Sequence, residues 1–129
     1  MTIGQAAQAA GLPVKTVRYY ADIGLVVPEG RAASGYRIYG TVEVGRLAFV
    51  RRARAFGFSV EECGELLGLY QDPGRASAEV KRLALTHLRT IDARLGELQR
   101  LRDELQLLAD ACAGDAGADC PILGAIAAG

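Results

Sequence analysis

Residues 77–111 read SAEVKRLALTHLRTIDARLGELQRLRDELQLLADA, and this stretch decides how the rest of the chain can fold. Its apolar side chains recur at alternating intervals of four and three residues, at Ala84, Leu88, Ile91, Leu95 and Leu98. After one extra step of three residues, the same seam continues through Leu101, Leu105 and Leu108. The spacing predicts a single helix with one apolar seam, and the extra step is a stammer in its heptad pattern.

A helix over residues 77–111 would be about 50 Å long, at a rise of about 1.5 Å per residue. The other residues of this 129-residue chain show no second long helix that could cover the seam. A monomeric bundle would need such helices, so we interpret the stretch as the dimerisation helix of a homodimer.

Half of the residues are hydrophobic, which is enough for one small core but hardly for two. No apolar run is long enough to span a membrane, and the N-terminus lacks the charged-then-apolar layout of a secretory signal. We therefore expect a cytoplasmic protein without membrane contacts.

Charge is distributed unevenly along the chain although the net charge is zero. Residues 1–58 hold eight Lys or Arg against three Asp or Glu, a net charge of +5, whereas residues 59–129 hold seven against twelve, a net charge of −5. A basic first half joined to an acidic second half suggests a polyanion-binding head on a body with another task.

The sequence predicts two short helices at the start of the head. Ile3–Ala10 is Ala-rich and stops at Gly11, and residues 14–23 follow with Pro13 at the first helical position and Gly24 as the cap. Together they make a helix-turn-helix, although small helical domains also use this pattern for packing alone. The second helix carries side chains suited to grooves and phosphates: Lys15, Thr16, Arg18 and Tyr19.

Residues 25–39 change to short β-favouring pieces separated by Pro, Gly and Ser, which predicts an extended hairpin or wing. Alternation along its last strand would place Tyr36 and Ile38 on one face and Arg37 and Tyr39 on the other. Arg31 and Arg37 would then be suited to phosphates.

Two further helices are expected before the long one. Thr41 can cap a helix that reaches Phe56 with arginines near its end, which either face DNA or offset the helix dipole. Ser59 and Glu62 form a capping box for a helix to about Tyr70, whose Cys63 we interpret as a small buried hydrophobe. Residues 72–74, Asp-Pro-Gly, then break the chain before the long helix.

Cys112 and Cys120 bracket a Gly-rich loop after the long helix, so their two sulfurs can meet. Pro121 fits the first position of a short helix through Ala127, which puts Cys120 at an N-cap where the helix dipole favours a thiolate. Two thiolates without a nearby His fit a soft monovalent ion such as Cu(I). A reversible disulfide and two inert surface thiols remain alternatives at this stage.

Several of these segments together resemble the MerR family of transcription regulators. The head segments are Ile3-Gly4 through Gly11, then residues 16–20 (TVRYY), 24–28 (GLVVP) and 35–39 (GYRIY). The tail segments, residues 111–115 (ACAGD) and 118–122 (ADCPI), resemble the copper-responsive branch, whose members also sense silver or gold. The resemblance extends over the whole chain.

The resemblance implies that the long helices of two copies pair antiparallel, with Ser77 of one copy beside the metal loop of the other. Family members that sense divalent ions carry a cysteine at the position of Ser77. The resemblance thus implies one monovalent ion, Cu(I), Ag(I) or Au(I), held in each loop by Cys112 and Cys120. The residues expected to contact DNA are Lys15, Thr16, Arg18, Tyr19, Tyr20, Arg31, Tyr36 and Arg37.

The expected fold is mainly α: a winged helix-turn-helix head at 1–58, a connecting helix and hinge at 59–76, an antiparallel coiled-coil dimerisation helix at 77–111, and a metal-binding loop with a short terminal helix at 112–129. By resemblance, the homodimer holds promoter DNA, and ion binding distorts it so that RNA polymerase can act. Alternatives are a MerR-type thiol or redox switch and a cytosolic metal-buffering protein. An enzyme is not expected, because the chain has no nucleophile–base pair, no phosphate-binding Gly loop and a single His.

Overall fold

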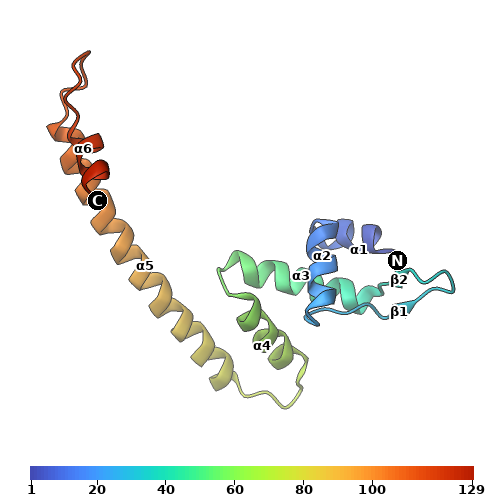
Figure 1. Ribbon diagram of the computed structural model, residues 1–129. Coiled ribbons are helices and arrows are strands. Elements are labelled where there is room, and N and C mark those ends of the chain that lie inside the picture. Colours follow the sequence, from blue (N-terminus) through green and yellow to red (C-terminus); the bar gives the residue numbers. More distant parts are fainter. The chain divides into compact units, whose positions relative to one another are not determined.

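A computed structural model describes all 129 residues and shows six helices and one two-stranded sheet (Figure 1). The elements are α1 (Ile3–Ala10), α2 (Val14–Asp22), β1 (Gly30–Arg31), β2 (Arg37–Ile38), α3 (Thr41–Ala55), α4 (Val60–Gln71), α5 (Ser77–Ala111) and α6 (Pro121–Ala128). This order confirms the predicted mainly α fold with a winged helix-turn-helix and one long helix. The chain forms two compact units, Met1–Leu83 and Ala84–Gly129, and each is described by itself.

The first unit has its core where α1 packs on both α2 and α3, and α3 in turn contacts α4. Alanines form the buried face of α1, which allows the neighbouring helices to approach closely. The largest fully buried side chains are Tyr39, Leu47, Val17, Val26, Val50 and Cys63. Cys63 thus occupies the core as a small hydrophobe, as predicted, and burial raises the pKa of its thiol.

Helix ends follow the sequence signals closely, with two corrections. Gly11 ends α1 in the left-handed region at φ +75°, and Ser59 caps α4 through the expected box with Glu62. Pro13 is the N-cap of α2 rather than its first helical residue. Thr41 does not cap α3. Gly40 takes that place, because the buried carboxylate of Glu43 accepts a 2.9 Å hydrogen bond from the Gly40 amide.

The wing is a short antiparallel hairpin in which Gly30 pairs with Ile38 and Arg31 with Arg37. The Glu29 amide extends the pairing by donating to the Ile38 carbonyl at 2.8 Å. At the base of the hairpin, the Tyr39 amide donates to the Met1 carbonyl at 2.8 Å, and the Tyr39 ring is fully buried. The wing is therefore anchored to the head at its base, while its tip extends into solvent.

In the second unit, α5 continues through the three-residue step of its seam without a break. The seam is open to solvent in the single chain: Leu95 and Leu98 are 58% and 62% exposed. Near the C-terminus, α6 lies beside α5 with no buried residue of its own, and a hollow of about 310 Å³ between them is lined mainly by Leu101, Leu105, Leu108 and Ile126. None of the helices combines the length and the apolar character needed to cross a bilayer.

Replacing Leu47 by Ala should destabilise the first unit, because it empties part of a core in which this side chain is fully buried. We expect a loss of about 2–5 kcal/mol in the free energy of unfolding. Urea denaturation followed by circular dichroism measures it. Val42→Ala on the exposed face of the same helix is the control, and an equal loss in both variants would contradict this description of the core.

Candidate functional site

Helix α2 presents one exposed basic face and one buried apolar face. Lys15, Arg18 and Tyr19 are exposed and Thr16 is half-buried, so these four candidate DNA-contacting residues lie at or near the solvent face of α2. Val17 on the opposite side is fully buried in the core. This division follows from the helical period and leaves the basic face available to a ligand.

Tyr20 does not share that exposed face. Its side chain is only 6% exposed and belongs to the core cluster. Burial raises the pKa of its hydroxyl, and the positive charge of Arg54 partly opposes this shift. Tyr20 is therefore the one candidate on α2 that packs into the core of the free chain, and its expected contact with DNA stays a prediction.

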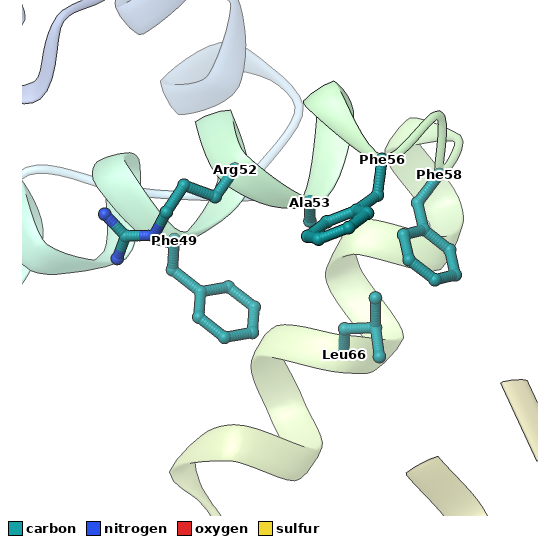
Figure 2. A pocket seen from close by; sticks show the side chains of 6 residues that line it. All are labelled: Phe49, Arg52, Ala53, Phe56, Phe58 and Leu66. Atoms are coloured by element: carbon teal, nitrogen blue, oxygen red, sulfur yellow. The ribbon is translucent and has the colours of Figure 1, made fainter. Parts of the chain in front are cut away.

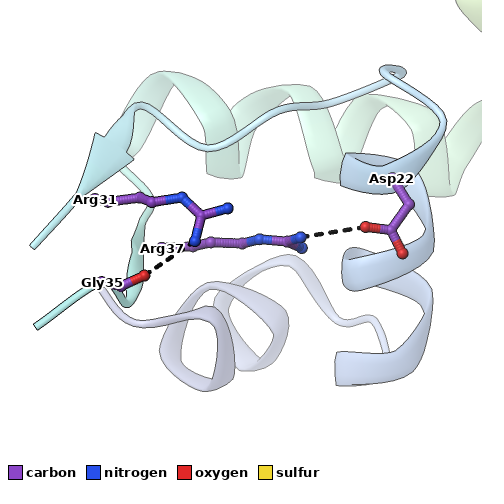
Figure 3. A network of polar contacts seen from close by, with 4 residues as sticks. All are labelled: Asp22, Arg31, Gly35 and Arg37. Atoms are coloured by element: carbon purple, nitrogen blue, oxygen red, sulfur yellow. Dashed lines mark hydrogen bonds and ion pairs between the residues drawn. The ribbon is translucent and has the colours of Figure 1, made fainter.

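The wing carries the other three candidates in different situations, and Figure 3 shows two of them, Arg31 and Arg37. Tyr36 is 75% exposed at the tip. Arg31 is exposed and donates from Nη1 to the Gly35 carbonyl at 3.1 Å, which holds its guanidinium over the turn. Both side chains are free to meet a ligand with little rearrangement.

Arg37 instead points back toward α2, where its Nη2 lies 3.2 Å from Oδ1 of Asp22. Its side chain is 27% exposed, and its charge acts on the buried Tyr39, the residue that follows β2. The sequence interpretation missed Asp22. A signal was present, because Asp22 is the single acid in α2 and stands four residues after Arg18, on the same helix face.

The arginines at the end of α3 have local partners. Arg54 donates from Nη1 to the Phe58 carbonyl at 2.6 Å, beyond the helix terminus. The Arg51 side chain covers Gly11, where a Cβ would meet its Nε at 3.4 Å. These contacts give both residues local structural partners: Arg51 lies over the turn between α1 and α2, and Arg54 ties the end of α3 to the chain that follows it.

An apolar pocket of about 270 Å³ opens where α3 meets α4 (Figure 2). Its lining residues are Phe49, Arg52, Ala53, Phe56, Phe58 and Leu66. The Phe49 ring also stacks on Tyr70 with 4.7 Å between the centroids. The lining has no acid, His or Cys, so the pocket offers hydrophobic contact and no catalytic chemistry.

The two thiols of the second unit come together at the start of α6. Cys112 directly follows α5 and Cys120 is the N-cap of α6, with Pro121 at the first position as predicted. Both are free thiols and half-buried, and a hollow of about 460 Å³ beside them is lined by Ala111, Ala113, Asp119, Cys120 and Pro121.

The surroundings of Cys120 favour its thiolate. The backbone amide of Leu123 contributes most to a lowered pKa of this thiol, and desolvation, the second largest effect, opposes it. Ile122 and the nearby Cys112 thiol add smaller effects that also lower the pKa. Neither amide forms a full cap bond with the sulfur, yet both point positive dipoles toward it. The two sulfurs are therefore close neighbours in an environment that tolerates negative charge.

Ser77, the remaining candidate, is the first residue of α5 and is exposed. It lies in the first unit, whereas the thiols lie in the second. No group of three His, Cys, Asp or Glu side chains gathers anywhere in the chain in a way that could hold a metal. The donor set that one chain offers to a soft ion is therefore the pair Cys112 and Cys120.

Comparison with known proteins places the chain among transcription regulators. Residues 1–69 match the family model "MerR HTH family regulatory protein", and residues 44–108 match "MerR, DNA binding". The chain is 52% identical to the HTH-type transcriptional regulator HmrR of Rhizobium leguminosarum bv. viciae, with 95% of each chain covered. It is 45% identical to the HTH-type transcriptional regulator CueR of Salmonella typhimurium, over 95% of this chain and 89% of the relative.

Among solved structures, the lead(II) complex of a transcription regulator from Ralstonia metallidurans CH34 matches with a TM-score of 0.83. The two chains are 32% identical and each is covered to 98%. All three relatives are regulators, in agreement with the prediction that this chain is not an enzyme.

The lowered pKa of Cys120 should be visible in its alkylation rate. In a Cys112→Ser variant, where Ser can still donate a hydrogen bond, we expect reaction with iodoacetamide to persist to lower pH than for an unperturbed thiol of pKa about 8.5. Mass spectrometry separates Cys120 from the buried Cys63. The same variant in denaturant is the control, and identical pH profiles in both conditions would contradict the helix-cap environment.

Proposed function

Because the chain belongs to the MerR family of helix-turn-helix transcription regulators, we propose that it is a copper-responsive activator of transcription. In this proposal it binds promoter DNA in the cytoplasm as a homodimer and takes up one monovalent ion per loop through Cys112 and Cys120. The observation that carries the metal assignment is the meeting of these two thiols at the N-terminus of α6, in a chain with no third ligand nearby.

The DNA side of the proposal rests on the exposed basic face of the head. Lys15, Arg18 and Tyr19 project from α2, in the position from which the second helix of a helix-turn-helix enters the major groove. Thr16 stands near them, and the wing adds Arg31 and Tyr36 for backbone contacts. The net charge of +5 over residues 1–58 supplies the electrostatic attraction to phosphates.

The choice of a monovalent ion rests on coordination chemistry. Zn(II) normally takes four ligands, whereas two thiolates suffice for linear Cu(I), and Ag(I) or Au(I) follow the same softness. Such a complex carries one negative charge, which the N-terminal amides of α6 can offset. If the partner's long helix runs antiparallel, it brings Ser77 to the loop, and a hydroxyl adds no soft ligand. The lead(II) relative binds a divalent ion, so copper specificity depends on these local differences.

Ion binding would act through a change in the DNA. Bending and untwisting a promoter costs on the order of several kcal/mol, and a ligand can contribute this only by binding one conformer of the protein more tightly than the other. RNA polymerase is the partner that would read the altered DNA. The proposed sequence of events is therefore ion uptake, change of conformer, distortion of the bound promoter and activation.

A thiol switch is the second candidate, because the same lowered pKa that favours a metal ligand also favours oxidation of Cys120. In that case the two sulfurs would form a reversible disulfide instead of holding an ion. Replacing Cu(I) by a mild oxidant in the transcription assay distinguishes the two. A metal buffer without DNA function would leave the basic face of α2 without a role.

Placing charge in the seam of α5 should prevent dimerisation. The double variant Leu95→Asp, Leu98→Asp would bury two unpaired carboxylates, so we expect monomers or insoluble protein. Sedimentation velocity at micromolar concentration measures the state. Ala93→Asp with Gln106→Asp adds the same charge outside the seam and should remain dimeric. A wild-type protein that sediments as a monomer would refute the homodimer.

Cys112→Ser and Cys120→Ser should each abolish Cu(I)-dependent activation while leaving DNA affinity nearly unchanged. We expect Cu(I) affinity to fall by at least about 100-fold, since even loss of a residue that merely supports a metal ligand can cost that much. An anaerobic titration against a competing chelator measures it. Binding should weaken as pH falls toward the thiol pKa values, because both sulfurs must lose their protons.

The reciprocal control is Arg18→Ala, which should retain Cu(I) binding and lose affinity for DNA. The DNA probe is an operator duplex selected from a random-sequence library by the wild-type protein. Copper-dependent activation by Cys112→Ser, or a wild-type preference for Zn(II) over Cu(I), would contradict the metal assignment.

A further inference from the structure

The contact between the wing and the recognition helix carries an inference about Asp22. We propose that Asp22 is a positioning residue for DNA binding: it holds the Arg37 guanidinium and thereby fixes the wing against α2. In this proposal Arg37 connects the wing to α2 within the head and does not contact a DNA phosphate. The inference rests on the proposed DNA-binding function of this face and changes the role expected for Arg37.

The wing needs such an anchor because it has little structure of its own. Its strands are two residues long each, and an isolated two-stranded hairpin is marginally stable at best. Backbone bonds at Tyr39 fix only its base. Between that base and the exposed tip, Arg37 is the side chain that reaches from β2 across to α2 (Figure 3).

The partial burial of the Arg37 side chain indicates a structural role inside the head. Its Nη1 is buried without a hydrogen-bond partner, and so is the hydroxyl of Tyr39. Burial raises the pKa of Tyr39, and the nearby charge of Arg37 opposes this shift. A guanidinium that is partly desolvated in this way depends on the carboxylate of Asp22 at its other nitrogen.

Asp22 also joins the wing to the residue expected to read DNA. Arg18 and Asp22 are four residues apart on one face of α2, and the charges of both act on Tyr39 at the wing base. A fixed Asp22–Arg37 pair would therefore set the distance between the groove-contacting side chains of α2 and the backbone-contacting side chains of the wing. A positioned surface loses less conformational freedom on binding than two independent ones.

A simpler reading is that Asp22 only neutralises a positive charge, and the two readings predict opposite signs. Its carboxylate is more than half exposed on a surface meant for phosphates. If it acts by charge alone, Asp22→Asn should tighten DNA binding and steepen the salt dependence by about one ion. If it positions the wing, the same substitution should weaken binding although it removes a repulsive charge.

The test measures affinity of the full chain for the selected operator duplex over a range of salt concentrations. We expect Asp22→Asn to weaken binding about tenfold with no steeper salt slope, and Asp22→Glu to restore most of the loss. Glu65→Gln on α4 removes an equal charge away from the wing and is the matched control. Tighter binding by Asp22→Asn, with a steeper salt slope, would overturn the proposal.

A double-mutant cycle identifies the partner. If Arg37 works through Asp22, the variant with both Asp22→Asn and Arg37→Gln should bind no worse than the poorer single variant. If Arg37 touches phosphate independently, the two losses add, and the proposal fails.

A measurement without DNA separates this proposal from the proposed function. Hydrogen exchange at the Glu29 and Ala32 amides, which donate within the hairpin, should accelerate in Asp22→Asn but not in Glu65→Gln. Unchanged exchange would overturn the positioning role. If the wild-type protein selects no DNA at all, the regulator assignment fails, while faster exchange would still support Asp22 as the anchor of the wing.

Discussion

The structure depends on one constraint: most of the apolar seam of α5 is exposed to solvent in the single chain, and only the short α6 lies beside its last turns. Helix α5 has 35 residues and exposes most of the leucines along its seam. The other helices have 8 to 15 residues each and are too short to cover a seam of that length. Apolar surface on this scale is stabilised only when another surface removes it from water. The helix therefore makes sense as half of a larger unit, with the DNA-binding elements before it in the chain and the two thiols after it.

The head holds a defined surface in place although its core is small. Small alanines on α1 let three helices share one core, and backbone bonds at Tyr39 fix the base of the wing. Polar contacts fix the segments that apolar packing does not hold. Glu43 accepts a hydrogen bond at the start of α3, and Asp22 pairs with Arg37 of the wing. Each of these contacts fixes the position of a particular group: the start of α3 in one case and the Arg37 guanidinium in the other.

The sequence predicted those features that depend on local periodicity or on a single signal residue. The bounds of α5 follow from its seam, and Gly11, Ser59 and Pro121 mark helix ends through their own backbone or side-chain chemistry. The sequence says less about features that tertiary contacts decide. Tyr20 looks like its exposed neighbour Tyr19 in sequence, and only packing separates them. Likewise, residue type alone makes Arg37 a candidate phosphate ligand, whereas the fold places its guanidinium 3.2 Å from Asp22, fifteen residues away in sequence.

The stammer between Leu98 and Leu101 has a consequence for how two chains can align. A regular heptad seam would let two helices slide past each other by seven residues and still interdigitate. A three-residue step overwinds the helix locally. Alignments of the two helices that differ by seven residues are then no longer equivalent, so one alignment is favoured. In an antiparallel pair the irregularity occurs twice, related by the dyad. The stammer would thereby fix the register of the two helices. It would also fix which turn of one helix faces the thiol loop of the other.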